Sequence, residues 1–224
     1  MTDENVRRTT AGNGDAKSRR AEARIRARNR AKILKAAVEL FARKGFDGVR
    51  ITEIARLSGL PKANIYYYFP SKSDIYQTLI DDVLSEWDAA LAHIRAVADP
   101  REALTAYITA KLAYSRTHAA QSRLFAGEML RGGSFLSRAQ KQHMREVTQD
   151  HAAVLETWIA DGRMTAVHPR HFLIMLWAST QYYADFEAVV GSVLETRRLK
   201  RTDYETAAAT IVTTVLDGCG TGAG

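Results

Sequence analysis

Proline occurs only four times in the 224 residues, at positions 61, 70, 100 and 169. Proline breaks helices and disrupts strand ladders, so its positions mark where regular structure starts and stops. Between these positions lie long stretches with little glycine and much alanine and leucine, which favour helix. Apolar residues recur at helical spacing, and no stretch has the alternation of a strand. The sequence therefore predicts an all-α protein.

Breaks in this pattern divide the chain into about nine helices. We expect a first helix from about Asn29 to Gly45, a short one capped by Thr52, a third between Pro61 and Pro70, and a fourth from Ser71 to about residue 97. Five more are expected at about 101–118, 121–131, 135–162, 169–194 and 203–217. The predicted domains are a disordered basic arm (1–27), a three-helix head (28–75), a larger helical body (76–218) and a flexible tail (219–224).

Charge is distributed unevenly along the chain. Residues 1–72 contain 17 Lys and Arg against 7 Asp and Glu, a net charge of +10, whereas the remainder contains 15 against 18, a net charge of −3. A basic head on a mildly acidic body is typical of a protein that binds a polyanion at one end. We expect double-stranded DNA to be that partner. The arm would add nonspecific affinity through six arginines, namely Arg19, Arg20, Arg24, Arg26, Arg28 and Arg30.

Other classes of protein fit the sequence less well. Cys219 is the single cysteine, so no intrachain disulfide can form, and a reducing, cytoplasmic location is expected. No apolar run is long enough to cross a membrane. His143 and His151 lie two helical turns apart, which is more typical of a solvated charged face than of a metal site. We find no nucleophile elbow, phosphate loop or Cys-x-x-Cys motif, and we expect neither an enzyme nor a cofactor.

A short helix, a tight turn at Gly59 and a second short helix predict a helix-turn-helix. Placed at 100° per residue, Ile65 and Phe69 form the buried face of the second helix and Tyr67 points directly away from it. An outward tyrosine suits a DNA groove, since hydroxyls donate to phosphates. The alternative is that the three tyrosines, Tyr66 to Tyr68, pack on the body. A basic module that docks on an anionic membrane or an acidic protein is a further alternative, although residues 17–30 contain only Ile25 as a large apolar side chain.

The stretch "ILKAAVELFARKGFDGVRITEIARLSGLPKANIYYYFPSKSDIY", residues 33–76, resembles the DNA-binding head of the TetR family of transcriptional repressors. The resemblance implies a homodimer that binds a palindromic operator and releases it when a small-molecule effector binds. It implies phosphate contacts from Thr52, Tyr67, Tyr68 and Lys72, and base-edge contacts from Lys62, Ala63, Asn64 and Tyr66. Pro61 departs from the family's usual Ser or Thr, so a phosphate donor is lost there.

The body also carries a resemblance. The stretches "KLAYSRTHAAQSRLFAGEML" and "WIADGRMTAVHPRHFLIMLWASTQYYADFEAVVG" are similar to the ligand-binding domain of the pyrimidine-utilization subgroup of this family, whose members sense uracil or thymine. The resemblance places the dimer interface in the last two expected helices, 169–194 and 203–217. The latter is rich in small and β-branched residues, as a close helix–helix seam would be (Ala207, Ala208, Ile211, Val212 and Val215).

The expected helix 169–194 carries an unusual polar stripe. Ile174, Trp177, Gln181 and Asp185 share one face. The Gln181 carboxamide could pair with the imide of a pyrimidine while Trp177 stacks on its ring. Trp87 is a second aromatic candidate, and Phe125, Tyr182 and Phe186 could complete the pocket wall. Another small aromatic or amide metabolite would fit as well. The alternative is structural: Trp177 in the core, Gln181 at a dimer interface and Asp185 paired with Arg123.

Overall fold

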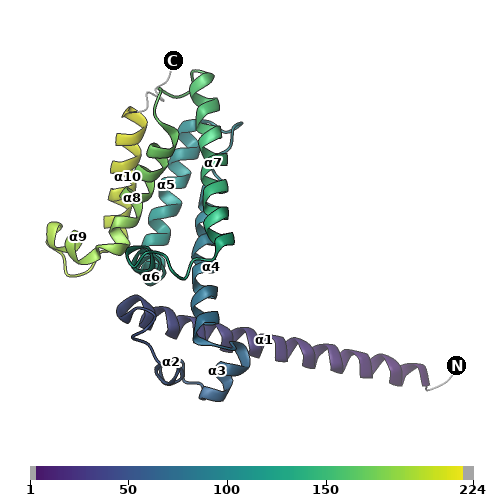
Figure 1. Ribbon diagram of the computed structural model, residues 1–224. Helices are drawn as coiled ribbons and strands as arrows, with labels where there is room; N and C mark the ends of the chain where they lie inside the picture. The colour runs from purple at the N-terminus through teal and green to yellow at the C-terminus, as the bar shows by residue number, and fades with distance from the viewer. Residues whose placement is uncertain (1–3, 219–224) are drawn as a thin grey trace. The chain divides into compact units, whose positions relative to one another are not determined.

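The computed structural model describes residues 4–218, and their side chains from residue 17 onward. Ten helices and no strand occur within these residues, which confirms the all-α class (Figure 1). In chain order they are α1 (Glu4–Lys44), α2 (Ile51–Ser58), α3 (Lys62–Tyr68), α4 (Lys72–Leu91), α5 (Pro100–Thr117), α6 (Ala119–Leu130), α7 (Arg138–Ala160), α8 (Pro169–Asp185), α9 (Glu187–Val193) and α10 (Arg201–Gly218). The expected tail at 219–224, with Cys219, lies outside the described residues.

The chain divides into two compact units, Met1–Tyr76 and Gln77–Gly224. In the first unit, a core of aliphatic side chains from α1, α2 and α3 surrounds three aromatic rings. The ring of Phe41 meets that of Tyr76 edge-on at a centroid distance of 5.0 Å, and Phe46 meets Tyr76 at 5.2 Å. Ile54 and Ile65 are fully buried in this unit. The ring contacts hold the start of α4 against the end of α1, and α2 packs on α1 and on α3.

Helix α1 is longer than the sequence analysis predicted. It begins at Glu4 and is continuous to Lys44, so most of the segment expected to be a disordered arm is helical (Figure 1). Our expectation rested on the lack of apolar side chains to bury, and residues 17–28 are indeed exposed. Helix formation does not require burial where alanine and arginine dominate, because both have high intrinsic helix propensity. The helix also has a folded C-terminal half from which to propagate.

The turn of the helix-turn-helix forms at Gly59, as expected. Gly59 has a φ of 69°, in the left-handed region, and its N–H caps α2 by donating to the carbonyl of Ala55. The N-cap differs from the expectation: Arg50, not Thr52, precedes the first helical residue. Its backbone N–H donates to Glu53 Oε2 at 2.9 Å. The Glu53 side chain therefore caps the start of α2, and Thr52 does not. Thr52 lies within the helix and is exposed.

In the second unit, α5, α8 and α10 run side by side around the main core (Figure 1). Proline stands at the first position of both α5 and α8, where the missing N–H costs no hydrogen bond. Asp99 caps α5 by accepting from Glu102 N at 3.0 Å. The expected helix 169–194 is two helices, because the chain breaks at Phe186 between α8 and α9. This break raises the number of helices from about nine to ten.

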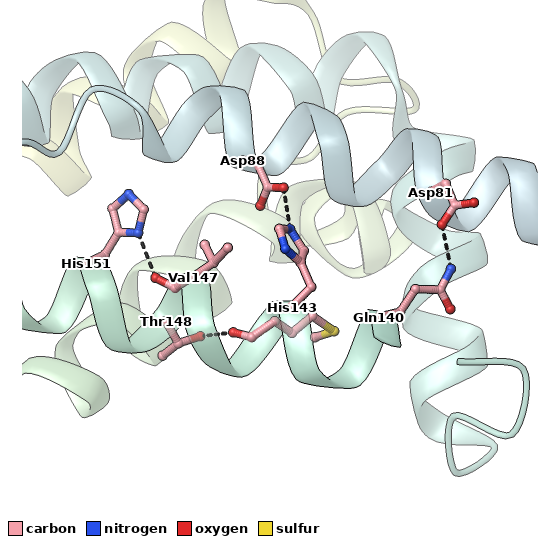
Figure 2. A network of polar contacts seen from close by, with 8 residues as sticks. Asp81, Asp88, Gln140, His143, Val147, Thr148 and His151 are labelled. Carbon is pink, nitrogen blue, oxygen red and sulfur yellow. Dashed lines mark hydrogen bonds and ion pairs between the residues drawn. The ribbon is translucent and has the colours of Figure 1, made fainter. Parts of the chain in front are cut away.

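A row of polar contacts joins α4 to α7 (Figure 2). Asp88 and Asp81 of α4 face His143 and Gln140 of α7. His143 Nε2 lies 2.6 Å from Asp88 Oδ2, and Gln140 Nε2 donates to Asp81 Oδ1 at 2.6 Å. Two turns beyond His143, His151 Nε2 lies 3.1 Å from the Leu91 carbonyl oxygen. The two histidines thus serve the packing of α4 on α7, and within residues 4–218 no cluster of His, Cys, Asp or Glu could hold a metal ion.

None of the helices in residues 4–218 is both long enough and apolar enough to cross a membrane.

Candidate DNA-binding surface and ligand site

Helix α3 presents two tyrosines to solvent and buries two apolar side chains. Ile65 is 0% exposed and Phe69 4%, whereas Tyr67 is 67% exposed and Tyr66 46%. Lys62 and Ala63, in the first turn, are exposed, and Asn64 and Tyr68 are half-buried. The buried and exposed faces of α3 expected from periodicity are therefore confirmed. The DNA contacts assigned to these residues stay a prediction.

Two tyrosine hydroxyls of α3 are held by side chains of α1. Arg26 donates to the Tyr67 hydroxyl at 3.1 Å, and Asn29 Nδ2 donates to the Tyr68 hydroxyl at 3.3 Å. The Tyr67 and Tyr68 rings also meet edge-on, at a centroid distance of 5.0 Å. Each hydroxyl that accepts a bond keeps its own O–H proton to donate elsewhere. The tyrosines are thus oriented before any partner arrives, and this arrangement suits phosphate binding.

Lys72 has a structural task that the sequence did not reveal. Its ammonium donates to the carbonyl oxygens of Phe46 and Val49 at 2.9 and 3.1 Å, and lies 4.1 Å from the centroid of the Phe46 ring. Two of its three donors are thereby engaged within the head. Lys72 ties the loop before α2 to the first turn of α4. A phosphate contact from Lys72 would have to use the remaining donor.

Within the second unit, the ligand candidates Trp87 and Phe125 are brought together. Their rings meet at a centroid distance of 4.7 Å and an angle of 71°. The Lys111 ammonium lies over the Trp87 ring, 4.1 Å from its centroid. Among the described residues, the Trp87 indole nitrogen is the buried side-chain donor with no hydrogen-bond partner. Since such groups are nearly always paired in folded proteins, this orphaned N–H indicates a place where a ligand acceptor could bind.

Lys111 is a buried cation, only 2% exposed, that the sequence analysis did not single out. Burial lowers the pKa of its ammonium to about 7 from the usual 10.5, although the charge of Asp185 acts in the opposite direction. Burial likewise raises the pKa of Asp185, against a hydrogen bond from Ser122 and the charges of Lys111 and Arg123. The available signal was a lysine in the apolar stretch "YITAKLAYS", on the same helical face as Tyr107.

The polar stripe of α8 faces α5 and α6. A hydrogen bond joins the side chains of Trp177 and Tyr107, so the indole N–H of Trp177 already has a partner. Ser122 donates to Asp185 Oδ1 at 2.6 Å. Asp185 is thus hydrogen-bonded to Ser122, and Arg123, its partner in the structural alternative, acts on it through charge. The Gln181 carboxamide, between these two contacts, makes no hydrogen bond within the described part of the chain.

Arg123 instead donates to the Ala184 carbonyl at 3.0 Å and to Glu187 Oε2 at 3.2 Å. It therefore ties α6 to the junction of α8 and α9. Ile174, expected on the polar stripe, is 51% exposed and does not share the side of α8 that faces α5 and α6. The two expected wall residues Tyr182 and Phe186 are also exposed, at 44% and 48%. Tyr182 and Phe186 stack on each other at 4.7 Å. The structure does not bring them together with Trp87 and Phe125, because they lie on another side of α8.

Tyr182 lines a groove on the outer side of α8 and α9, of about 560 Å³. The groove is almost entirely apolar, and its lining includes Met175, Val189, Val193 and Leu194. An exposed apolar surface of this kind marks an interaction site more often than a solvated face. In α10, by contrast, Ala207 and Val215 are buried in the core of their own unit, so the expected seam of small residues is only partly available to a partner.

Two family models match adjacent parts of the chain. Residues 33–79 match the model described as bacterial regulatory proteins, tetR family. Residues 80–222 match the model described as YcdC-like protein, C-terminal region. The first match contains the helix-turn-helix, and the second contains Trp87, Lys111 and the polar stripe of α8. Together they account for all of the chain except residues 1–32 and the last two residues.

Full-length relatives agree with the models. The chain is 39% identical to the HTH-type transcriptional regulator RutR of Escherichia coli K12 over 166 residues, which are 72% of this chain and 78% of RutR. It is 32% identical to the transcriptional repressor NicS of Pseudomonas putida over 137 residues, 61% of this chain and 64% of NicS. The structure of AibR in complex with isovaleryl coenzyme A and operator DNA has the same fold, with a TM-score of 0.62, 18% identity, and coverage of 84% of this chain and 97% of AibR. The chain belongs to the TetR family of DNA-binding transcriptional regulators, which are not enzymes.

Proposed function

We propose that the protein is a repressor that binds a palindromic operator as a homodimer in the bacterial cytoplasm and releases it when a small planar ligand binds the second unit. The exposed face of α3 supports the DNA contact, with Tyr67 and Tyr68 on phosphates and Lys62, Ala63, Asn64 and Tyr66 at base edges. The observation that carries the ligand site is the buried, unpartnered Trp87 N–H beside Lys111. In AibR, the same fold occurs with an effector and operator DNA together.

A second copy of this chain is the proposed occupant of the groove on α8 and α9. Dimers read palindromic DNA because two-fold symmetry in the protein matches two-fold symmetry in the site. The groove suits such an interface because it is apolar, and Phe186, which stacks on Tyr182, adds exposed apolar area beside it. A two-fold interface is self-complementary, so one apolar groove serves both copies.

The proposed effector is a pyrimidine base, uracil or thymine. Trp87 and Lys111 are buried donors, and a pyrimidine dione presents two carbonyl acceptors in the plane of its ring. Gln181 could pair with an adjacent N–H and carbonyl of the base at once. Phe125 and Trp177 supply apolar ring faces. This assignment rests on the resemblance of the body to pyrimidine-sensing regulators and on the donors that the fold leaves without partners.

Helix α4 connects the two proposed functions. It is continuous from Lys72, which follows the helix-turn-helix, to Leu91, and it carries Trp87 on the way. A ligand that binds Trp87 more tightly in one position of α4 than in another shifts the population of head spacings. The coupling free energy needed for a regulatory response is about 1–3 kcal/mol.

Calorimetric titration with uracil, thymine and cytosine tests the ligand proposal. We expect uracil and thymine to bind and cytosine to fail, because cytosine has an amino donor and a ring acceptor where the diones have a carbonyl and an N–H. Gln181→Ala should weaken uracil binding by about 1–3 kcal/mol, since a buried polar group of the ligand is left unpaired. The exposed Gln149→Ala is the matched control and should bind as the parent does.

Release of operator DNA by the same ligands is the second measurement. Equal binding of all three bases would overturn the proposed donor–acceptor match, and binding of none would overturn the pyrimidine assignment in favour of another small aromatic or amide ligand. If Gln181→Ala abolished dimerisation instead of the ligand response, the role of Gln181 would be structural.

A further inference from the structure

The six arginines between residues 19 and 30 lie on different sides of α1. At 100° per residue, Arg19, Arg26 and Arg30 lie within about 40° of one another, Arg24 and Arg28 lie about 140° and 180° from the middle of that group, and Arg20 lies about 100° from it, at the side of the helix. All belong to the continuous helix Glu4–Lys44, and all six are exposed. In a disordered arm all six arginines could contact DNA equally, whereas a helix directs them to different sides.

Only one of these faces meets α3. Arg26 donates to the Tyr67 hydroxyl at 3.1 Å, and its guanidinium lies 5.9 Å from the centroid of the Tyr67 ring. The Arg30 guanidinium lies 5.3 Å from the centroid of the Phe69 ring, and Asn29 donates to Tyr68. These contacts place the Arg26 face of α1 beside the residues that the helix-turn-helix presents to DNA.

The same face continues past the end of α3 as a shallow groove. Its lining is Arg19, Glu22, Ala23, Arg26, Ala27 and Arg30, and its volume is about 360 Å³. The short side chains of Ala23 and Ala27 leave the groove open between the longer arginine side chains. Glu22 is the one carboxylate in the lining. Arg19 lies seven residues before Arg26, about 10 Å further along the helix axis. The groove therefore lengthens the basic surface beyond the reach of α3.

We propose that this face of α1 is a second DNA-binding surface, and that Arg26 and Tyr67 together bind one backbone phosphate. The chemistry of the pair supports a shared ligand. The Tyr67 hydroxyl accepts from Arg26 and keeps its own proton to donate, while the guanidinium uses one N–H on Tyr67 and has others available for the same phosphate oxygens. Arg19 binds a further phosphate along the same strand, and Arg24 and Arg28 face away from the duplex. The inference rests on the proposed DNA-binding function and adds to it a defined surface outside the helix-turn-helix.

The test compares two double variants with the same change of charge. Arg19→Ala with Arg26→Ala removes the α3 side, and Arg24→Ala with Arg28→Ala removes the opposite side. Alanine retains helix propensity in both. Affinity for a mixed-sequence DNA duplex is measured across a series of salt concentrations with the full-length protein. Loss of two phosphate contacts should reduce the slope of log K against log salt by about 1.8 per bound head in the first variant, and the second should keep the parent slope.

A double-mutant cycle tests the shared phosphate. Arg26→Ala and Tyr67→Phe, each alone and combined, should be non-additive, because either change disrupts the same contact. Additive effects would overturn the shared phosphate. Equal reductions of the salt slope in the two double variants would mean that the arginines act through net charge alone, without a defined binding face. No reduction in either would mean that α1 does not contact DNA. If the parent protein itself failed to bind DNA, the proposed function would be lost, and that result is distinct from all the others.

Discussion

The Lys111 ammonium lies 4.1 Å above the ring of Trp87, whose own N–H has no hydrogen-bond partner among the described residues. A cation and an indole donor are thus buried side by side with little to neutralise or accept from them. Burial of such groups destabilises a folded protein unless a partner is supplied. We interpret this arrangement as a site whose missing acceptors belong to the effector.

Replacing the buried cation with an apolar side chain should make the ligand-free protein more stable. Burial lowers the pKa of Lys111 from 10.5 to about 7, so between these values the unfolded chain binds a proton that the folded chain does not. Stability of the parent should therefore rise as the pH increases from 7 towards 10. Lys111→Met should flatten this rise and increase the free energy of unfolding at pH 7 by several kcal/mol, at about 1.4 kcal/mol per pKa unit.

Urea unfolding at a series of pH values between 7 and 9.5 measures this effect. The range stops there because burial also raises the pKa of Tyr107 and Tyr114. Deprotonation of these tyrosines in the unfolded chain would lower stability at higher pH. The exposed Lys141→Met serves as the control and should match the parent. A Lys111→Met protein with the parent's pH dependence would show that Lys111 keeps its ordinary protonation in the fold.

Two substitutions on α3 should separate affinity from specificity. Tyr67→Phe removes the proposed phosphate donor, so we expect weaker binding to operator and scrambled duplexes alike. Asn64→Ala removes the side chain that we propose reads a base edge, and should cost about 1–3 kcal/mol on the best site while relaxing preference at one position. Binding of each variant to both duplexes measures the difference. A Tyr67→Phe protein that lost affinity for the operator alone would contradict the phosphate assignment.

Lys72 should affect folding as well as DNA binding. Its two hydrogen bonds to the Phe46 and Val49 carbonyls hold the loop before α2. We therefore expect Lys72→Ala to lower the free energy of unfolding by about 1–3 kcal/mol in addition to weakening binding to all DNA sequences. Thermal unfolding of the variant is compared with that of Lys35→Met, an exposed lysine of α1. Unchanged thermal stability would assign Lys72 to phosphate binding alone.

A charge in the groove on α8 and α9 should dissociate the proposed homodimer. Val193 is 75% exposed and lines the groove, so Val193→Glu would place a carboxylate in an apolar interface without disturbing the core. Light scattering after gel filtration should show a monomer. Val97, which is 91% exposed and lies outside the groove, provides the control Val97→Glu, expected to remain dimeric. If the Val193→Glu protein also stayed dimeric, the interface would lie elsewhere.

Local features of this fold could be predicted from the sequence because they depend on neighbours within one helical turn. The burial of Ile65 and Phe69 and the exposure of Tyr67 follow from helical periodicity. The cap formed by Ser71, whose Oγ accepts from the Asp74 backbone N–H at 3.2 Å, follows from residue type at a helix start. The helix starts at Pro100 and Pro169 follow from the geometry of proline.

Features that depend on distant contacts could not be predicted in this way. Lys72 finds its carbonyl partners 23 and 26 residues away. Trp177 finds its partner on α5, and whether Tyr182 faced the interior or the outer groove depended on how α8 packs. The burial of Lys111 could not be predicted because a single lysine in an apolar helix is usually solvated, and only the packing of the neighbouring helices buries it. The length of α1 could not be predicted from burial, because its N-terminal half forms by helix propensity alone.

The backbone conformation at Gly59 discriminates between L- and D-residues at this position. Its φ of 69° is unfavourable for an L-residue, yet a Cβ at this position would meet no atom within 4 Å. Crowding therefore plays no part, and the strain of about 1–2 kcal/mol comes from backbone chirality alone. A D-alanine at this position favours a positive φ and restricts the unfolded chain, so we expect it to stabilise the head where L-alanine weakens it.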